Sequence, residues 1–411
     1  MRENSLQNIQ FSSPDSTDYL RTKQWLEGTT GPALTIERRP FLFPLILAMA
    51  DTFFPVPLRS TALFVIQALC WLATPNVLVA ACRADKNNLW SIVWPFIALI
   101  GCVSLHLLTL HALTETLFVL MASIWCYLFT AKSVKNFALL FVISLLACLR
   151  PMYFVHAILW LVYCFVKLLT VPRGRLACFA SLLLSASPIF AQLALVFHAA
   201  GIAIFSTSGD FTLRCWLANQ VYRASLIDGS VPWEQGCQIM MNLSSPDLIH
   251  LLLSNWQLTI SSWFNNLLLN NVLSQSNYAM GFPLLSKSSE ITNAAFLGIH
   301  IIMAAMLSIA LLKIRSKVLS SNLLWLLAFA AIHFALTGIS YSQGDRLIVT
   351  AMPFWIVGYW WLISIVDQAQ RPGSTNPGPY LPLHLNPTHI TNTPSNMATY
   401  FTAAPNPLNT E

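Results

Sequence analysis

Charged side chains are scarce in this chain. Asp, Glu, Lys and Arg make up only 9% of the 411 residues, whereas 56% are hydrophobic. A soluble globule of this size needs far more charge on its surface, so the composition excludes that class. Backbone groups inside a bilayer must be satisfied within their own segment, which favours helices in the long apolar runs. The sequence therefore predicts an all-α polytopic membrane protein.

The chain also lacks the short motifs of nucleotide and metal chemistry. It contains no CxxC, HExxH, P-loop or GxGxxG string, which leaves a nucleotide-driven pump or a cytoplasmic metalloenzyme without support. The net charge of +6 is concentrated in one set of short loops, so topology explains it and no nucleic-acid partner is predicted.

The apolar residues form about nine runs that we interpret as transmembrane helices. They lie near residues 60–81, 89–109, 112–131, 137–150, 152–170, 176–199, 291–313, 321–341 and 345–366. The breaks after the first, third, fifth and seventh runs hold ten basic residues: Arg83, Lys86, Lys132, Lys135, Lys167, Arg173, Arg175, Lys313, Arg315 and Lys317. Because cytoplasmic loops concentrate Lys and Arg, these breaks are predicted to be cytoplasmic and the others external.

This alternation divides the chain into five parts. Residues 1–58 form an external segment with a short re-entrant or interfacial helix, residues 59–199 hold helices one to six, and residues 200–290 form a large external loop. Residues 291–366 hold the last three helices, and residues 367–411 form a cytoplasmic tail that we expect to be disordered. Residues 1–58 must cross the membrane to be external. To explain this we favour a further transmembrane helix upstream of residue 1 over export of a short polar N-terminal tail.

The large external loop is predicted to fold into interfacial helices instead of an independent soluble domain. Its apolar residues recur at helical spacing between Leu248 and Leu267, with Asn, Ser and Gln between them. Cys215 and Cys237 both lie in this loop, where an oxidising compartment permits a disulfide; the bridged and free states both stay open.

Ionisable residues beside apolar runs are expensive in a membrane and are therefore functional candidates. The predicted external side holds Asp15, Asp18, Arg38, Arg39, His106, His111, Glu115, Arg150, Asp345 and Arg346. Carboxylates and arginines on one face suit a reaction in which a carboxylate removes a proton while guanidinium groups hold an anionic leaving group such as phosphate. The two histidines are interpreted as interface residues, with a metal site as the alternative.

Six stretches together resemble the polytopic GT-C glycosyltransferases, most closely the protein mannosyltransferases and the aminoarabinose lipid A transferase. They are Pro14 to Leu20, Trp25 to Gly28, Arg38 to Leu45, Leu113 to Phe118, Leu149 to Pro151 and Gly344 to Leu347. The first three are similar to the family's first external loop, the fourth to its TETLF helix end, the fifth to its RP break and the last to its RYRLP-like helix entry. Their joint order carries the resemblance.

The resemblance implies a polyprenyl-phosphate sugar donor, a glycan, lipid or protein acceptor, and chemistry at the outer face of a bilayer, with a bacterial inner membrane as the expected location. It implies no certain cofactor, although some relatives hold a divalent cation between acidic loops. Asp15 would be the general base, with Asp18 and Glu115 as further catalytic carboxylates. The donor phosphate would be bound by Arg346, Arg39 and Arg150. Asp15 and Arg346 should therefore approach one another, because the base and the phosphate-holding group must flank the same anomeric carbon.

Structural interpretations of the same residues stay open. Asp15 and Asp18 could be solvated residues of a loose tail, or Asp15 a helix cap. Glu115 could cap a helix or pair with Arg150, and Arg346 could be an interfacial anchor. Two other functions also stay open: a transporter or lipid-linked sugar flippase, whose charges would line a path across the membrane, and a surface polysaccharide polymerase or ligase.

The topology is testable by labelling. A cysteine introduced at Ser230 should react with a membrane-impermeant maleimide on intact cells, whereas one introduced at Val134 should not, because the basic loops alternate with the others. Labelling at position 134 alone would contradict the topology and the proposed active face.

Overall fold

The computed structural model describes residues 14–29, 36–82, 89–131, 136–170, 175–226, 231–273, 283–313, 321–340 and 346–370. The predictions for most of the basic loop residues, for Asp345 and for the tail after Gln370 lie outside the described residues; the loop residues concerned are Arg83, Lys86, Lys132, Lys135, Arg173, Arg315 and Lys317.

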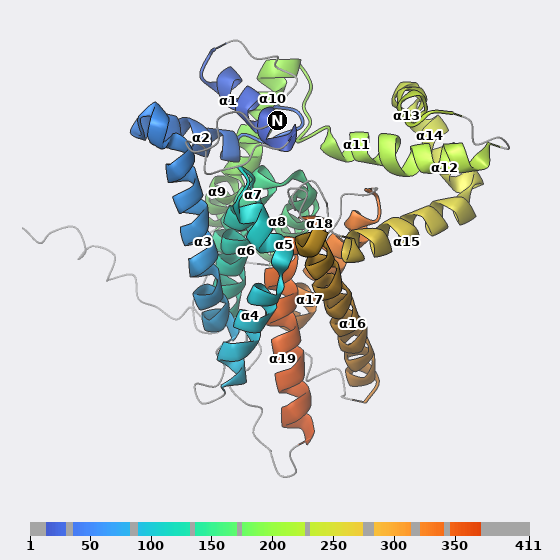
Figure 1. Ribbon diagram of the computed structural model, residues 1–411. Helices are drawn as coiled ribbons and strands as arrows, with labels where there is room; N and C mark the ends of the chain where they lie inside the picture. Colours follow the sequence, from blue (N-terminus) through green and yellow to red (C-terminus); the bar gives the residue numbers. More distant parts are fainter. Residues whose placement is uncertain are drawn as a thin grey trace, which may run out of the picture.

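Helices are the regular elements throughout these ranges, and no strand occurs in them (Figure 1). The first part of the chain forms a bundle from α1 (Pro14–Leu26), α2 (Leu42–Phe53), η2 (Val56–Leu58), α3 (Arg59–Cys82), α4 (Trp90–Gly101), α5 (Val103–Thr109), α6 (Glu115–Thr130), α7 (Asn136–Leu149), η3 (Pro151–Tyr153), α8 (Phe154–Leu169), α9 (Arg175–Ser185) and α10 (Ser187–Ala200). α1 and α2 lie at one end of the bundle, which we call the α1 end (Figure 1).

The rest of the chain first leaves the bundle and then returns to it (Figure 1). A side lobe is formed by α11 (Ser208–Thr212), the π-helix η4 (Leu213–Ala218), α12 (Asn219–Ser225), α13 (Trp233–Asn242) and α14 (Ser245–Ser254). The chain returns through α15 (Trp256–Val272) to α16 (Pro283–Lys313), α17 (Ser321–Thr337), α18 (Arg346–Val349) and α19 (Met352–Gln370). α16 and α19 extend to the end of the bundle opposite α1 (Figure 1).

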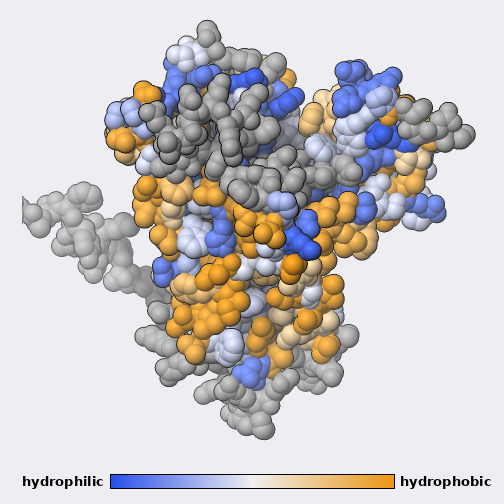
Figure 2. All heavy atoms as spheres, viewed as in Figure 1, coloured by the Kyte–Doolittle hydropathy of each residue, from blue (hydrophilic) through white to orange (hydrophobic). Residues whose placement is uncertain are grey.

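Three helical stretches of the described chain are long and apolar enough to cross a membrane: Val56–Cys82, Pro151–Leu169 and Pro283–Leu311. The number rises to five if α4 with α5, and α9 with α10, each count as one bent span. Hydrophobic residues dominate the surface around α3, α4 and α16, and hydrophilic residues gather over α1 and the lobe (Figure 2). These long apolar helices are compatible with an integral membrane protein, while the count of nine spans stays a prediction.

Three predicted single helices are broken in the structure, and one of them, the run 345–366, is divided into α18 and α19. The run 89–109 bends by 65° at Cys102, and the run 176–199 bends by 54° at Ala186. Pro188 explains the break at Ala186, because proline lacks an N–H and is best accommodated in the first turn of a new helix. No proline stands at Cys102, whose ψ of 80° leaves the helical region.

Two predicted boundaries also move. α16 begins at Pro283 instead of near residue 291, because its first turns are polar and a hydropathy pattern does not detect them. α6 begins at Glu115, three residues later than the apolar run suggests, since residues 110–114 form a turn.

Aromatic rings form the centre of the bundle. Trp125 of α6 is fully buried, and its ring centroid lies 5.5 Å from Trp160, 5.2 Å from Phe329 and 5.6 Å from Phe354. Such ring pairs stabilise a core beyond simple burial of their area. This cluster ties α6 to α8, α17 and α19, the helices from which the site described below is built.

The asparagines between the apolar residues of α15 explain how the lobe is attached. Asn266 exchanges hydrogen bonds with Gln220 of α12 at 2.8 and 3.2 Å, and Asn270 donates to Thr337 O at 2.9 Å and to Ser340 O at 2.6 Å. The opposite side of α14 and α15 exposes Ile249, Leu253, Trp256, Ile260 and Phe264. The predicted helices are confirmed for the described residues, and their position at the interface stays a prediction.

Cys215 and Cys237 form a disulfide that joins η4 to α13, with Cα atoms 4.4 Å apart. The bridged state, which the sequence left open, is thus the one that the structure contains. It closes a loop whose ends are 22 positions apart and covers a small core of Ala218, Met240 and Leu248.

We expect Cys215→Ser or Cys237→Ser to lower the free energy of local unfolding of the lobe by about 3 kcal/mol, because a closed loop restricts the unfolded chain. Hydrogen exchange of α13 in rising denaturant measures this loss. The double variant should lose no more than either single one, and Cys178→Ser, which removes a free cysteine, is the control. Equal protection in all variants would contradict the prediction.

Candidate functional site

Two of the predicted carboxylates lie on helix α1, which is packed against neighbouring segments. Pro14 opens the helix, where its fixed φ fits, so that Asp15 stands in the first turn. Tyr19 is only 3% exposed, and Ser16 Oγ donates to Ala112 O at 3.0 Å. The interpretation of Asp15 as part of a loose tail therefore does not hold.

Arg39 joins both carboxylates of α1. It precedes α2, and its Nη2 contacts Oδ1 of Asp15 while its Nε lies 3.5 Å from Oδ2 of Asp18. The guanidinium also lies over the ring of Tyr19, 5.4 Å from the ring centroid. Arg39 is therefore held by two charges and one aromatic face.

Arg346 begins α18 and links α1 to α6. Its Nη1 contacts Oδ2 of Asp15, and its Nε contacts Oε1 of Glu115. The side chain is only 4% exposed. The prediction that Asp15 and Arg346 lie close together, although they are 331 positions apart, is confirmed.

Glu115 is the second carboxylate that binds Arg346, and it also binds Arg150. It stands at the start of α6 with 0% of its side chain exposed, and Arg150 Nη1 lies 2.9 Å from its Oε1. The same oxygen contacts Arg346, so one carboxylate bridges two guanidinium groups. The predicted pairing of Glu115 with Arg150 is correct but incomplete.

All six predicted site residues thus meet in one ion network, in the order Asp18, Arg39, Asp15, Arg346, Glu115 and Arg150. They come from α1, the segment before α2, the start of α6, the junction of α7 with η3, and α18. The structure brings together the six residues to which the resemblance assigned catalytic or phosphate-binding roles, while these chemical roles stay predictions.

The network is balanced in charge, since three carboxylates face three guanidinium groups. An isolated buried charge is expensive, and pairing explains how Glu115 can be fully buried. Burial lowers the pKa of the Arg346 guanidinium to about 9. This value is still above neutral pH, so Arg346 is a cation and can hold an anion. α18 lies outside the helices that could span a membrane.

Two buried glutamines that sequence reasoning missed hold the backbone next to the network. Gln192 of α10 accepts from Phe41 N at 3.0 Å and donates to Ile36 O at 3.2 Å, which fixes the segment before α2. Gln67 of α3 donates to Leu113 O at 2.6 Å, just ahead of α6. A side-chain amide inside an apolar run costs free energy unless it is hydrogen-bonded, so glutamine is rare there. This rarity is the sequence signal that could have identified Gln67 and Gln192.

Among the remaining candidates, Arg38 and His106 contact groups outside the network. The Arg38 guanidinium lies over the ring of Phe211, 5.1 Å from its centroid. His106 Nδ1 lies 2.7 Å from Cys102 O, one turn back in the chain, and His111 is buried. Within the described part of the chain, no group of three or more His, Cys, Asp or Glu side chains is placed to hold a metal ion.

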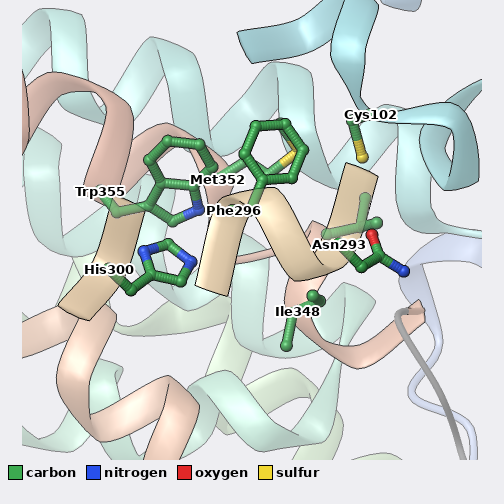
Figure 3. A pocket seen from close by; sticks show the side chains of 8 residues that line it. Cys102, Asn293, Phe296, His300, Ile348, Met352 and Trp355 are labelled. Atoms are coloured by element: carbon green, nitrogen blue, oxygen red, sulfur yellow. The ribbon is translucent and has the colours of Figure 1, made fainter. Parts of the chain in front are cut away.

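A small pocket lies beside α18 (Figure 3). It is lined by Cys102, Asn293, Phe296, His300, Ile348, Val349, Met352 and Trp355. The lining is mostly apolar, with the amide of Asn293 and the imidazole of His300 as its polar groups (Figure 3). The space corresponds to about one water molecule, which is too small for a sugar or a lipid chain.

No family model, curated protein or solved structure matches this chain.

The network predicts unequal effects of two carboxylate substitutions. Glu115→Gln should lower the free energy of unfolding by about 3 to 5 kcal/mol, because it leaves two buried guanidinium groups around a neutral amide. Asp18→Asn should lower it by at most about 1 kcal/mol, because Asp18 is 29% exposed and makes one long pair. Unfolding in detergent by heat or denaturant measures both, and equal losses would contradict the bridging role of Glu115.

Proposed function

We propose that this chain is a membrane glycosyltransferase of the GT-C type. It moves a sugar from a polyprenyl-phosphate donor to a hydroxyl of a glycan, lipid or protein acceptor at the outer face of the membrane, in a bacterium the inner membrane. The observation that carries the proposal is the meeting of Asp15, Asp18 and Glu115 with Arg39, Arg150 and Arg346 in one network. A carboxylate that accepts a proton and guanidinium groups that bind phosphate are the two parts that this reaction needs.

The proposed reaction is a single displacement. The acceptor oxygen attacks the anomeric carbon of the sugar, and its proton moves to the Asp15 carboxylate. The bond between the anomeric carbon and the phosphate oxygen breaks, and the electron pair leaves with the polyprenyl phosphate. Arg346 neutralises this leaving group, with Arg39 and Arg150 beside it, so that the phosphate departs without a strong acid.

Donor binding requires an exchange of partners at Arg346. In the structure this guanidinium is already bound to Asp15 and Glu115. The donor phosphate takes the place of Asp15, which is partly exposed, whereas the fully buried Glu115 remains. Asp15 then loses one guanidinium partner and accepts a proton more readily. The donor thus activates the base that the acceptor uses.

Two arrangements favour a transferase over a transporter or flippase. The network lies at the α1 end of the bundle, as a reaction at one membrane face requires. A second ion cluster, formed by Lys23, Asp51 and Arg59, lies at the same end. A transport path needs polar groups through the middle of the bundle, where the ring cluster around Trp125 is packed. A polysaccharide polymerase or ligase would share the donor chemistry and differ in its acceptor.

The proposal predicts different kinetics for two variants. With a panel of polyprenyl-phosphate sugars and the purified protein, Asp15→Asn should lower kcat by at least about 100-fold, because the proton acceptor is lost. Donor binding should be kept or tightened, since the phosphate no longer competes with a carboxylate. Arg346→Ala should weaken donor binding as well as turnover.

Asp210→Asn is the matched control, because Asp210 pairs with Arg214 at 2.8 Å in the lobe and lies outside the network. Its activity should equal that of the wild type. Full activity of Asp15→Asn would assign the base to another residue, with Asp18 or Glu115 next, and absence of transfer by the wild type from every donor would contradict the proposed function.

A further inference from the structure

Helix α18 depends on its neighbours for its position. It has only four residues, Arg346–Val349, and a single turn is not stable alone. Its first residue nevertheless joins Asp15 to Glu115. The position of Arg346 is therefore set by the side chains that bind the backbone of this turn.

His333 of α17 binds the turn from one side. Its Nε2 lies 2.5 Å from Leu347 O and 3.1 Å from Thr350 Oγ1. A carbonyl oxygen only accepts, so Nε2 carries the proton and the imidazole is the donor. His333 is fully buried, which makes this bond stronger than one in water.

Tyr153 of η3 binds the same turn from another element. Its hydroxyl donates to Thr350 O at 2.9 Å, and its ring lies against the imidazole of His333 with centroids 5.0 Å apart. The side chains of all three residues are buried from solvent. His333, Tyr153 and Thr350 thus form one contact cluster, which we call the α18 support.

The α18 support also reaches the second arginine that Glu115 binds. Tyr153 follows Arg150 by three residues, and its backbone N–H donates to Arg150 O at 3.0 Å. Arg150 and Arg346 contact the same oxygen of Glu115. The two guanidinium groups are therefore joined twice, once through Glu115 and once through the backbone segments that meet at the α18 support.

We propose that His333 and Tyr153 are positioning residues that fix the spacing of Arg346 and Arg150 without touching the substrate. The inference rests on the proposed function, in which Arg346 holds the donor phosphate. When the phosphate replaces Asp15, Arg346 loses one of its two carboxylate partners, and the α18 support keeps the turn in place. This arrangement lets Arg346 exchange an anion while its backbone stays fixed.

Hydrogen–deuterium exchange tests the support without any assay of transfer. In His333→Leu, amides of residues 346–352 should exchange roughly tenfold faster than in the wild type, because a buried hydrogen bond to the turn is lost. His333→Gln places an amide donor near the position of Nε2 and should restore most of the protection. Trp94→Phe is the matched control, since it removes a bond from Nε1 to Ile356 O of α19 at 3.0 Å and leaves α18 alone.

A transfer assay then separates positioning from a general loss of folding. His333→Leu should raise the KM for the donor by roughly tenfold and also lower kcat, because a displaced Arg346 binds the phosphate less well in the ground and transition states. A merely structural role would reduce the amount of active enzyme and leave KM unchanged, which would overturn the proposal. His333→Gln should return KM close to the wild-type value.

Tyr153→Phe keeps the test informative if His333→Leu does not fold, because it removes only the hydroxyl that donates to Thr350 O. Faster exchange at residues 346–352 in this variant supports the proposal. Unchanged exchange there, relative to Trp94→Phe, overturns it whatever the assay shows. Faster exchange in a protein whose wild type transfers no sugar would support the role of the α18 support in placing Arg346 and would contradict the proposed function instead.

Discussion

The site depends on one buried carboxylate that binds two guanidinium groups. Glu115 has no exposed side-chain surface, and its Oε1 accepts from both Arg150 and Arg346. Removing any one of these three residues leaves an uncompensated charge in a low-dielectric interior, which is strongly unfavourable. The start of α6, the α7–η3 junction and α18 are therefore bound to one another by charge as well as by packing. Asp15, Arg39 and Asp18 extend the same chain of ion pairs to α1 and to the segment before α2.

Rigid placement of these charges comes from uncharged side chains on other helices. Gln192 fixes the segment before α2, Gln67 fixes the turn before α6, and His333 with Tyr153 fixes α18. In the proposed reaction, this arrangement means that the arginines are already oriented when the donor arrives, so that little reorganisation opposes the transfer. The partly exposed Asp15 is the one partner of Arg346 that the phosphate displaces. One anion replaces another at this guanidinium, which connects the charge balance of the network to its proposed activity.

The scarcity of charge in an apolar chain made ten ionisable residues conspicuous as candidates, and the resemblance to the GT-C glycosyltransferases implied the six among them that form this site. The sequence also predicted helices and the closeness of Asp15 and Arg346. It could not predict the break at Cys102, where no proline stands, or the start of α16 in polar residues, because hydropathy averages over a window. It offered the pairing of Glu115 with Arg150, but it did not predict which carboxylates Arg39 and Arg346 bind, or the bonds of Gln67 and Gln192. These follow from distances between helices that no local pattern encodes. The nine-span topology stays a prediction.

The most direct test of the proposed function is an experimental structure of the protein in lipid nanodiscs with a polyprenyl-phosphate sugar bound. We expect the phosphate within about 3 Å of the Arg346 guanidinium, in the place that Asp15 occupies here. The anomeric carbon should face the freed Asp15 carboxylate, and Glu115 should still bridge Arg150 and Arg346. A donor bound at the end of the bundle where Asp367 lies, or elsewhere with the Asp15–Arg346 pair intact, would contradict this account.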